Sequence, residues 1–339
     1  VRPVSSSRAP IDSFGCTNFR VDWMSDIREI LNRLNSGEIS AAEVPDEMVL
    51  QVAAEVLLVE AEGPDEILTR LSSLQRDVLG LQALLMEGDL ASAVVLSEEL
   101  LARSRSKEER DLECGVRVRM ERALLAVDGP ETSGLELKWC TERLKVIAPG
   151  SALHGISLLN LGAWHVNNGE VMMAMAVHAD ITRNSGHPPE IRGLSRLEVG
   201  RILTALDDLD PAMRHLWTAK AVFADAGMVA ESVVASLEWL DLALEEVVED
   251  SPRMLNRIQN AAPRAVPGSS WIPANRSDVV DVVEHILPIL LTDVGGMERN
   301  DLGLILDASQ ILEESSWSEA IAEKSESIQD ARLLEALQS

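Results

Sequence analysis

Aromatic residues are almost missing from this sequence. Tyrosine is absent and phenylalanine occurs three times, so that with seven tryptophans the aromatic fraction is only 3%. Hydrophobic residues still make up 46% of the chain, so the core must be built from Leu, Val, Ile, Ala and Met. Such aliphatic cores suit layers of packed helices, and the alternating pattern of β-strands is nearly missing. The composition therefore predicts an all-α fold.

Cysteine is also scarce, and long apolar runs are missing. Cys16, Cys114 and Cys140 are widely spaced and include no CxxC pair. This spacing argues against a disulfide framework or a zinc site and indicates a reducing compartment. No stretch reaches the roughly 18 apolar residues that a membrane span needs. We therefore expect a cytoplasmic protein without a membrane partner.

Basic residues are outnumbered by acidic ones. The chain has 30 Lys and Arg, of which only five are Lys, against 56 Asp and Glu, and its net charge is −26. Nucleic-acid backbones and anionic membranes are bound through clustered Lys and Arg, so neither is an expected partner. Acidity gathered on one face would attract basic proteins or peptides. An even spread would instead indicate adaptation to a saline habitat.

The start of the chain differs from the rest. Residues 1–23 show no periodicity, and we expect a disordered tail or an incorrectly assigned start, with Met24 as the true first residue. Residues 24–44 are predicted to form a short helical hairpin that begins with a helix over Met24–Asn35. Its sequence LNRLNSGEISAAE resembles the small helix-turn-helix of several bacterial and archaeal regulators. Pro45 shortens the second helix of that motif.

From Pro45 to residue 262 the helical signals are continuous and are interrupted only by short Gly, Pro and Asn turns. Such short loops make consecutive helices antiparallel neighbours. Residues 263–277 are predicted to be a Pro/Gly-rich linker in which Trp271 is an exposed contact candidate. Residues 278–339 form a C-terminal helical segment, either a separate module or the capping end of the array. The helices expected before the linker are 45–61, 64–87, 90–105, 107–127, 133–147, 151–168, 170–185, 189–206, 210–226, 229–249 and 252–261.

A pattern of small residues recurs after 38 positions. Its first copy starts at Gly162 and its second at Gly200. Small residues at this spacing indicate where two antiparallel helices come close, and a period of this length indicates a stacked repeat array. The matching residues are Leu161, Gly162, Ala174, His178 and Ile181 in the first copy, and Val199, Gly200, Ala212, Leu216 and Ala219 in the second.

The segment Leu158–Ile181 resembles a tetratricopeptide (TPR) repeat. That family places Leu-Gly on the first helix, a Gly-acid turn between the helices and a small residue on the second. Leu161-Gly162, Gly169-Glu170 and Ala174 fill these positions. The period of 38 is longer than the family's period of about 34, and most of its aromatic positions are lost. An α-solenoid of HEAT-like helix pairs is the structural alternative.

The resemblance implies an α-solenoid of antiparallel helical hairpins, a TPR-like superhelix. It also implies a non-catalytic scaffold or adaptor that binds a segment of a partner protein in its concave groove. One alternative is a regulatory or sensor module that controls transcription or signalling, with 24–44 as its effector end. Another is an enzyme with an unrecognised site. By position in the family, the groove residues are Asn160, Ala163, Asn167, Leu197, Arg201 and Thr204.

No motif for catalysis or metal binding is evident. The six histidines form neither HxH nor HExxH, so a structural role is the favoured interpretation. His165 and His178 occupy positions where the repeat expects packing residues. Met172, Met173 and Met175, with Trp164, are interpreted as core residues, with a pliable methionine surface as the alternative. We therefore expect no metal site and no cofactor.

Overall fold

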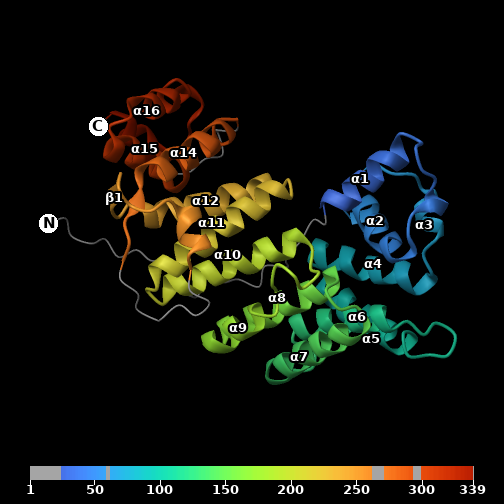
Figure 1. Ribbon diagram of the computed structural model, residues 1–339. Coiled ribbons are helices and arrows are strands. Elements are labelled where there is room, and N and C mark those ends of the chain that lie inside the picture. Colours follow the sequence, from blue (N-terminus) through green and yellow to red (C-terminus); the bar gives the residue numbers. More distant parts are fainter. Residues whose placement is uncertain (1–23, 59–61, 262–270, 293–298, 339) are drawn as a thin grey trace. The chain divides into compact units, whose positions relative to one another are not determined.

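The computed structural model describes residues 24–58, 62–261, 271–292 and 299–338. Within these residues it is helical almost throughout, with seventeen α-helices and two strands of two residues each (Figure 1). The all-α prediction is confirmed. The chain folds as two compact units, the first ending at Arg192 and the second beginning at Gly193. This boundary falls inside α10 (Pro189–Ala205), the helix that carries the second copy of the repeat.

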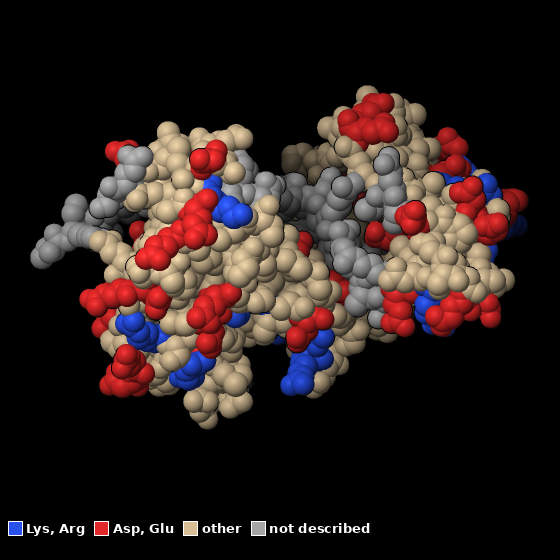
Figure 2. All heavy atoms as spheres, turned by 90° about the horizontal axis from the view of Figure 1, so that it is seen from above, with Lys and Arg blue, Asp and Glu red and all other residues tan. Residues whose placement is uncertain are grey.

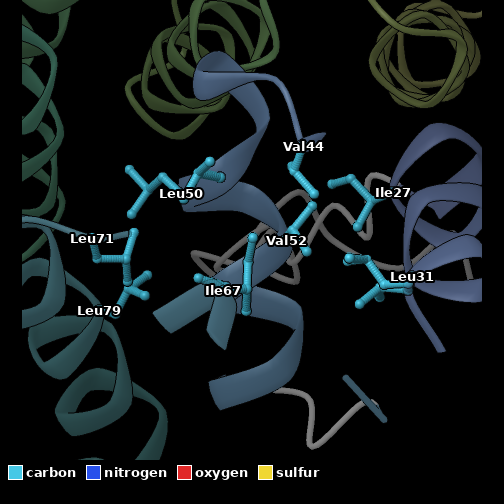
Figure 3. Packing of buried hydrophobic residues seen from close by; sticks show 11 residues of the cluster. Ile27, Leu31, Val44, Leu50, Val52, Ile67, Leu71 and Leu79 are labelled. Carbon is cyan, nitrogen blue, oxygen red and sulfur yellow. The ribbon is translucent and has the colours of Figure 1, made fainter. Parts of the chain in front are cut away.

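The first unit begins with a small helical cluster. Its elements are α1 (Met24–Asn35), the 3-10 turn η2 (Ala41–Glu43), α2 (Asp46–Leu58) and α3 (Glu66–Thr69). Their apolar side chains meet in one core, in which Ile27 and Leu31 of α1 gather with Val52 of α2 and Ile67 of α3 (Figure 3). Residues 24–44 therefore share a core with the segment that follows them and do not form a separate hairpin.

The second helix expected in the segment 24–44 is a single turn. Ser40 and Glu43 form a capping box, with the Ser40 N–H donating to the Glu43 carboxylate at 2.8 Å. Val44 leaves the turn in an extended conformation (φ −65°, ψ 128°) because Pro45 follows it. Arg70 fixes this corner by donating to the Val44 carbonyl at 2.5 Å. The resemblance to a helix-turn-helix therefore lacks its second helix.

The rest of the first unit is a series of helices packed in chain order (Figure 1). Each helix contacts the next, α4 contacts α6, and α6 contacts α8. These three helices form one row, against which α5, α7 and α9 pack. The six helices are α4 (Ser73–Glu87), α5 (Leu90–Arg103), α6 (Leu112–Leu124), α7 (Pro130–Ile147), α8 (Ala152–Asn167) and α9 (Val171–His178).

The turn residues account for the ends of these helices. Ser72 and Gln75 form a capping box at the start of α4, which ends at Gly88 in the left-handed conformation (φ 79°). Asp89 then caps α5 by accepting the N–H of Ser92 at 3.1 Å. Pro130 occupies the first position of α7, where no backbone N–H is needed. The sequence predicted the Gly88-Asp89 break correctly.

The second unit continues from α10 through seven further helices. Gly227 (φ 74°) turns the chain between α11 and α12, and the fully buried Trp239 packs edge-on against Trp217 at 5.0 Å between ring centres. α12 also contacts α14 and α15, so the C-terminal helices pack directly on the helices before them. The seven helices are α11 (Leu209–Asp225), α12 (Val229–Ala243), α13 (Met254–Gln259), α14 (Arg276–Leu290), α15 (Arg299–Leu312), α16 (Ser315–Ala322) and α17 (Ala331–Gln338).

Part of the predicted linker 263–277 is ordered. Strand β2 (Ala274–Asn275) pairs in parallel with β1 (Val247–Val248). The Asn275 side-chain amide donates to the carbonyls of Glu249 and Ser251 at 2.9 and 2.6 Å. Residues 274–275 are therefore held against β1 and the turn that follows it. The predicted linker residues 263–270 lie outside the described residues, as does the predicted tail 1–23.

Candidate functional site

The two copies of the repeat make the same helix contact. A β-carbon on Gly162 would lie 2.7 Å from His178 Nε2, and one on Gly200 would lie 2.7 Å from Leu216 Cδ2. Both partners follow their glycine after sixteen residues and are buried. The glycines therefore allow α8 to approach α9, and α10 to approach α11, more closely than any larger residue would. His178 serves this packing contact, as the repeat pattern predicted.

A second glycine pair, which the sequence analysis missed, follows the same period. Gly155 and Gly193 are also 38 residues apart. A β-carbon there would lie 2.6 Å from Ile191 or 2.5 Å from Phe223, respectively. Gly155 and Gly193 have the same 38-residue spacing as Gly162 and Gly200, and this shared spacing was the signal in the sequence that would have revealed them. The glycines on each repeat helix are seven residues, or two turns, apart, but Gly155 approaches α10 whereas Gly193 approaches α11, so these two contacts are not equivalent.

Two of the predicted groove residues are buried. Asn160 of α8 and Leu197 of α10 have only 6% and 4% of their surface accessible to solvent. A partner segment cannot reach side chains that the protein itself covers. These two residues therefore contribute to packing, and the groove placement carried over from the TPR family does not hold for them.

Arg201 is occupied by two carboxylates of its own unit. It donates to Glu238 at 2.6 Å and to Glu198 at 2.7 Å. Burial alone lowers the pKa of Arg201, but the hydrogen bonds to Glu238 raise it on balance. Burial also raises the pKa of Glu198, which lies largely inside the protein. Because its donors are satisfied internally, Arg201 is not available to clamp a partner's carboxylate.

The remaining predicted contact residues differ in accessibility. Asn167 at the end of α8 is exposed, and Ala163 is half-buried. The Thr204 hydroxyl donates to the carbonyl of Gly200 at 3.0 Å within its own helix. Trp271 is half-buried and thus less accessible than expected. The predicted set therefore does not combine into one open surface.

α9 exposes methionines where the sequence predicted core. Its eight residues, VMMAMAVH, include no acidic or strongly basic residue. Ala174 and His178 face inward, whereas Met172 and Met173 are 75% and 53% exposed. Helices that are apolar on all sides are normally buried. The alternative considered for these methionines, a pliable surface, fits the structure.

α7 also exposes an apolar stripe. Leu135, Trp139 and Val146 lie along its outer side with 70%, 40% and 73% of their surface accessible. The exposed Lys138 and Glu142 lie among them. The Lys145 ammonium group of the same helix contacts the Asp180 carboxylate, just beyond α9, at 3.0 Å. The apolar surfaces of α7 and α9 thus belong to neighbouring helices.

Two histidines meet where the first turn of α8, which carries His154, adjoins the loop before α10, which carries His187. The Nε2 atom of His187 lies 3.1 Å from Nδ1 of His154, and both rings are buried. Nδ1 of His187 lies 2.6 Å from the Ser185 hydroxyl. Burial lowers the pKa of His187 to about 4, aided by the neighbouring His154, and burial also lowers the pKa of His154. Both rings are thus neutral at pH 7 and bind the start of α8 to the loop before α10.

The two cysteines that the structure describes are poorly placed for nucleophilic chemistry. Cys114 and Cys140 are buried, and burial raises the pKa of each thiol to about 12, so neither is a thiolate nucleophile near pH 7. In the part of the chain that the structure describes, no three His, Cys, Asp or Glu side chains gather as metal ligands. No helix of the described ranges is long and apolar enough to cross a membrane.

Acidic side chains are distributed over both units. Figure 2 shows them at many points of the visible face, with basic side chains among them, rather than in one patch. Many arginines are paired with these acids, as Arg103 is with Asp77 and Glu109 at 2.7 Å each. The visible face therefore offers no single acidic patch as a docking site.

The chain was compared with family models, curated proteins and solved structures. No family model matches it, and neither a curated protein nor a solved structure shows significant similarity to it.

Proposed function

We propose that the protein is a non-catalytic scaffold of the cytoplasm, an α-solenoid of TPR-like hairpins that binds a segment of a partner protein. The row formed by α4, α6 and α8 and the equivalent glycine contacts at Gly162 and Gly200 support the repeat architecture. In such an array each hairpin buries its faces against its neighbours, and the remaining surface is available for partners.

The exposed methionines of α9 carry the proposal. Met172 and Met173 present flexible thioethers on a helix that includes no Asp, Glu, Lys or Arg. Methionine adapts its shape to different apolar partners and is frequent in surfaces that bind peptides. An apolar patch on a chain of net charge −26 is best explained by a partner that covers it.

This surface replaces the concave groove as the proposed binding site. Asn160 and Leu197 of that groove are buried, and Arg201 is bound by Glu238. The partner segment is apolar where it meets α9. Basic residues outside that contact would speed its association with the acidic chain.

A scaffold is favoured over a regulatory module by the way residues 24–44 pack. A separate effector would present an independent face, whereas Ile27 and Leu31 are buried in a core shared with α2 and α3. This segment is better explained as the closing end of the helical array.

The proposal is tested by affinity capture from cells that produce the protein. One bait is the unchanged full chain, and the other carries Met172→Glu and Met173→Glu, whose side chains point to solvent. A control bait carries Val229→Glu and Leu255→Glu, which add the same charge at exposed apolar positions of the second unit. We expect one stoichiometric partner with the unchanged and control baits and its loss from the methionine variant.

Circular dichroism of each bait verifies that its helices are intact. A partner retained equally by all three baits would move the binding site away from α9. The absence of any stoichiometric partner would contradict a scaffold function and direct attention to ligand sensing or catalysis.

A further inference from the structure

The residues of the apolar stripe on α7 are spaced symmetrically, with the same intervals from either end of the stripe. Leu135, Trp139, Glu142 and Val146 follow one another at intervals of four, three and four residues. These intervals place all four side chains on one face of the helix, as in the contact seam of a coiled coil. Leu135, Trp139 and Val146 are exposed, and so is Glu142.

We propose that two copies of the chain pair through this stripe, with their α7 helices antiparallel. In that arrangement Leu135 lies opposite Val146 of the other copy, and Trp139 lies opposite Glu142. Each contact occurs twice, as a two-fold axis requires. The central pair also suits hydrogen bonding, because an indole N–H is a donor and a carboxylate is an acceptor.

The charge of α7 favours a second copy over a basic partner. The helix has as many acidic as basic residues, although the chain as a whole carries −26. A basic protein would find no excess of negative charge here. Another copy of this acidic chain is repelled least where the surface is neutral. The charged residues of α7 are Glu131, Glu136 and Glu142 against Lys138, Arg143 and Lys145.

The tryptophan at the centre of the stripe is held in place. The Arg119 guanidinium lies 3.8 Å from the centre of the Trp139 ring. Arg119 is itself fixed by Glu136, to which its Nη2 donates at 2.8 Å. An indole positioned in this way loses little conformational entropy on binding, which favours it as an anchor. One helix pair buries a small area, so we expect a reversible, concentration-dependent dimer.

Sedimentation equilibrium of the purified full chain tests the pairing and needs no other protein. We expect a monomer–dimer equilibrium that Leu135→Glu or Val146→Glu shifts to monomer at every concentration. Leu255→Glu, at a similarly exposed position in the second unit, is the matched control and should still dimerise. A chain that is monomeric throughout, or a dimer that both α7 variants retain, would overturn the proposal.

Cysteine cross-linking tests the antiparallel register. In a Cys16→Ser background, a mixture of Leu135→Cys and Val146→Cys chains should form a disulfide under mild oxidation. Either variant alone should form much less, because its new cysteines are at opposite ends of the contact. Cys114 and Cys140 are buried and do not interfere in the folded chain. Equal cross-linking of the single variants would exclude this register. This result is independent of whether α9 binds a partner.

Discussion

His154 in the first turn of α8 faces His187, with Nδ1 of His154 3.1 Å from Nε2 of His187, where the loops before α8 and α10 meet in the first unit. The loops approach so closely that a β-carbon on Gly150 would lie 2.5 Å from the Ser185 carbonyl oxygen. The hydrogen bond between the two imidazoles requires an unprotonated nitrogen on one ring as the acceptor. Lys145 disfavours charge on His154 and Asp180 favours it, but burial dominates. The junction of these loops is therefore sensitive to protons.

Acidification should weaken the first unit through this pair. The unfolded chain takes up protons on these histidines near their ordinary pKa of 6.5, whereas folded His187 does so only near 4. The contribution of His187 to the free energy of unfolding is complete above pH 6.5 and is lost as the pH falls toward 4. Chemical denaturation at pH values across this range should show that loss. His187→Gln should flatten the dependence, and His285→Gln, at an exposed position of α14 in the second unit, is the control.

The repeat glycines should tolerate no side chain. Gly200→Ala would place a β-carbon 2.8 Å from Leu216 Cγ, and overpacking of this kind costs about 1–3 kcal/mol. Gly80→Ala in α4 meets no atom within 4 Å and should stabilise the chain by about 1 kcal/mol, because alanine favours helix. Urea denaturation of both variants gives the two free-energy changes. Equal effects at the two glycines would contradict the close helix contact.

Arg257 should be essential to the second unit. It is buried, donates to the Asp210 carboxylate at 3.1 Å, and also donates to the Pro273 carbonyl. Arg257→Met leaves Arg214 as the remaining partner of Asp210 and removes the donor to the Pro273 and Ile272 carbonyls, which should cost about 1–3 kcal/mol. Hydrogen exchange should detect faster opening of α11 and α13. Arg332→Met, which removes an exposed pair with Asp330, should change stability by less than about 1 kcal/mol. Similar exchange in both variants would refute a structural role for the buried pair.

Methionine oxidation should distinguish surface from core. Dilute hydrogen peroxide should oxidise Met172 and Met173 well before Met213 and Met254, which have no exposed surface. Peptide mass spectrometry at successive times gives the order of reaction. If a partner covers α9, its addition should protect the first two methionines. Early oxidation of Met213 with Met172 unmodified would show that the side-chain exposure described for α9 is wrong.

The sequence predicted the helices well because their ends are encoded locally. Met24–Asn35 has the predicted bounds, and Gly88-Asp89 ends one helix and begins the next as expected. The helix predicted for 170–185 stops at His178 instead. The loop after it is held by the Ser185 hydroxyl, which donates to Thr182 and contacts His187. His187 in turn contacts His154, 33 residues earlier, and no local sequence pattern predicts that contact.

The predicted contact residues depended on information that the sequence lacks. Helical periodicity shows that α8 has an inner face, but not that Asn160 is covered as well. Arg201 is paired with Glu238, 37 residues away on another helix, and only a structure brings these charges together. Met172 was expected in the core because a run of apolar residues usually belongs there. That inference fails where a surface is apolar.

The short ladder between β1 and β2 has a consequence for proteolysis. Hydrogen bonds join Asn275 to Ser251 and the Pro273 carbonyl to Arg257 of α13, and α12 packs against α14 and α15. A protease that cut between Ala261 and Trp271 would therefore leave two fragments still associated. Such a nick would be visible on a denaturing gel, while the native protein would migrate as before. The covalent continuity of the second unit can thus be lost without loss of its assembly.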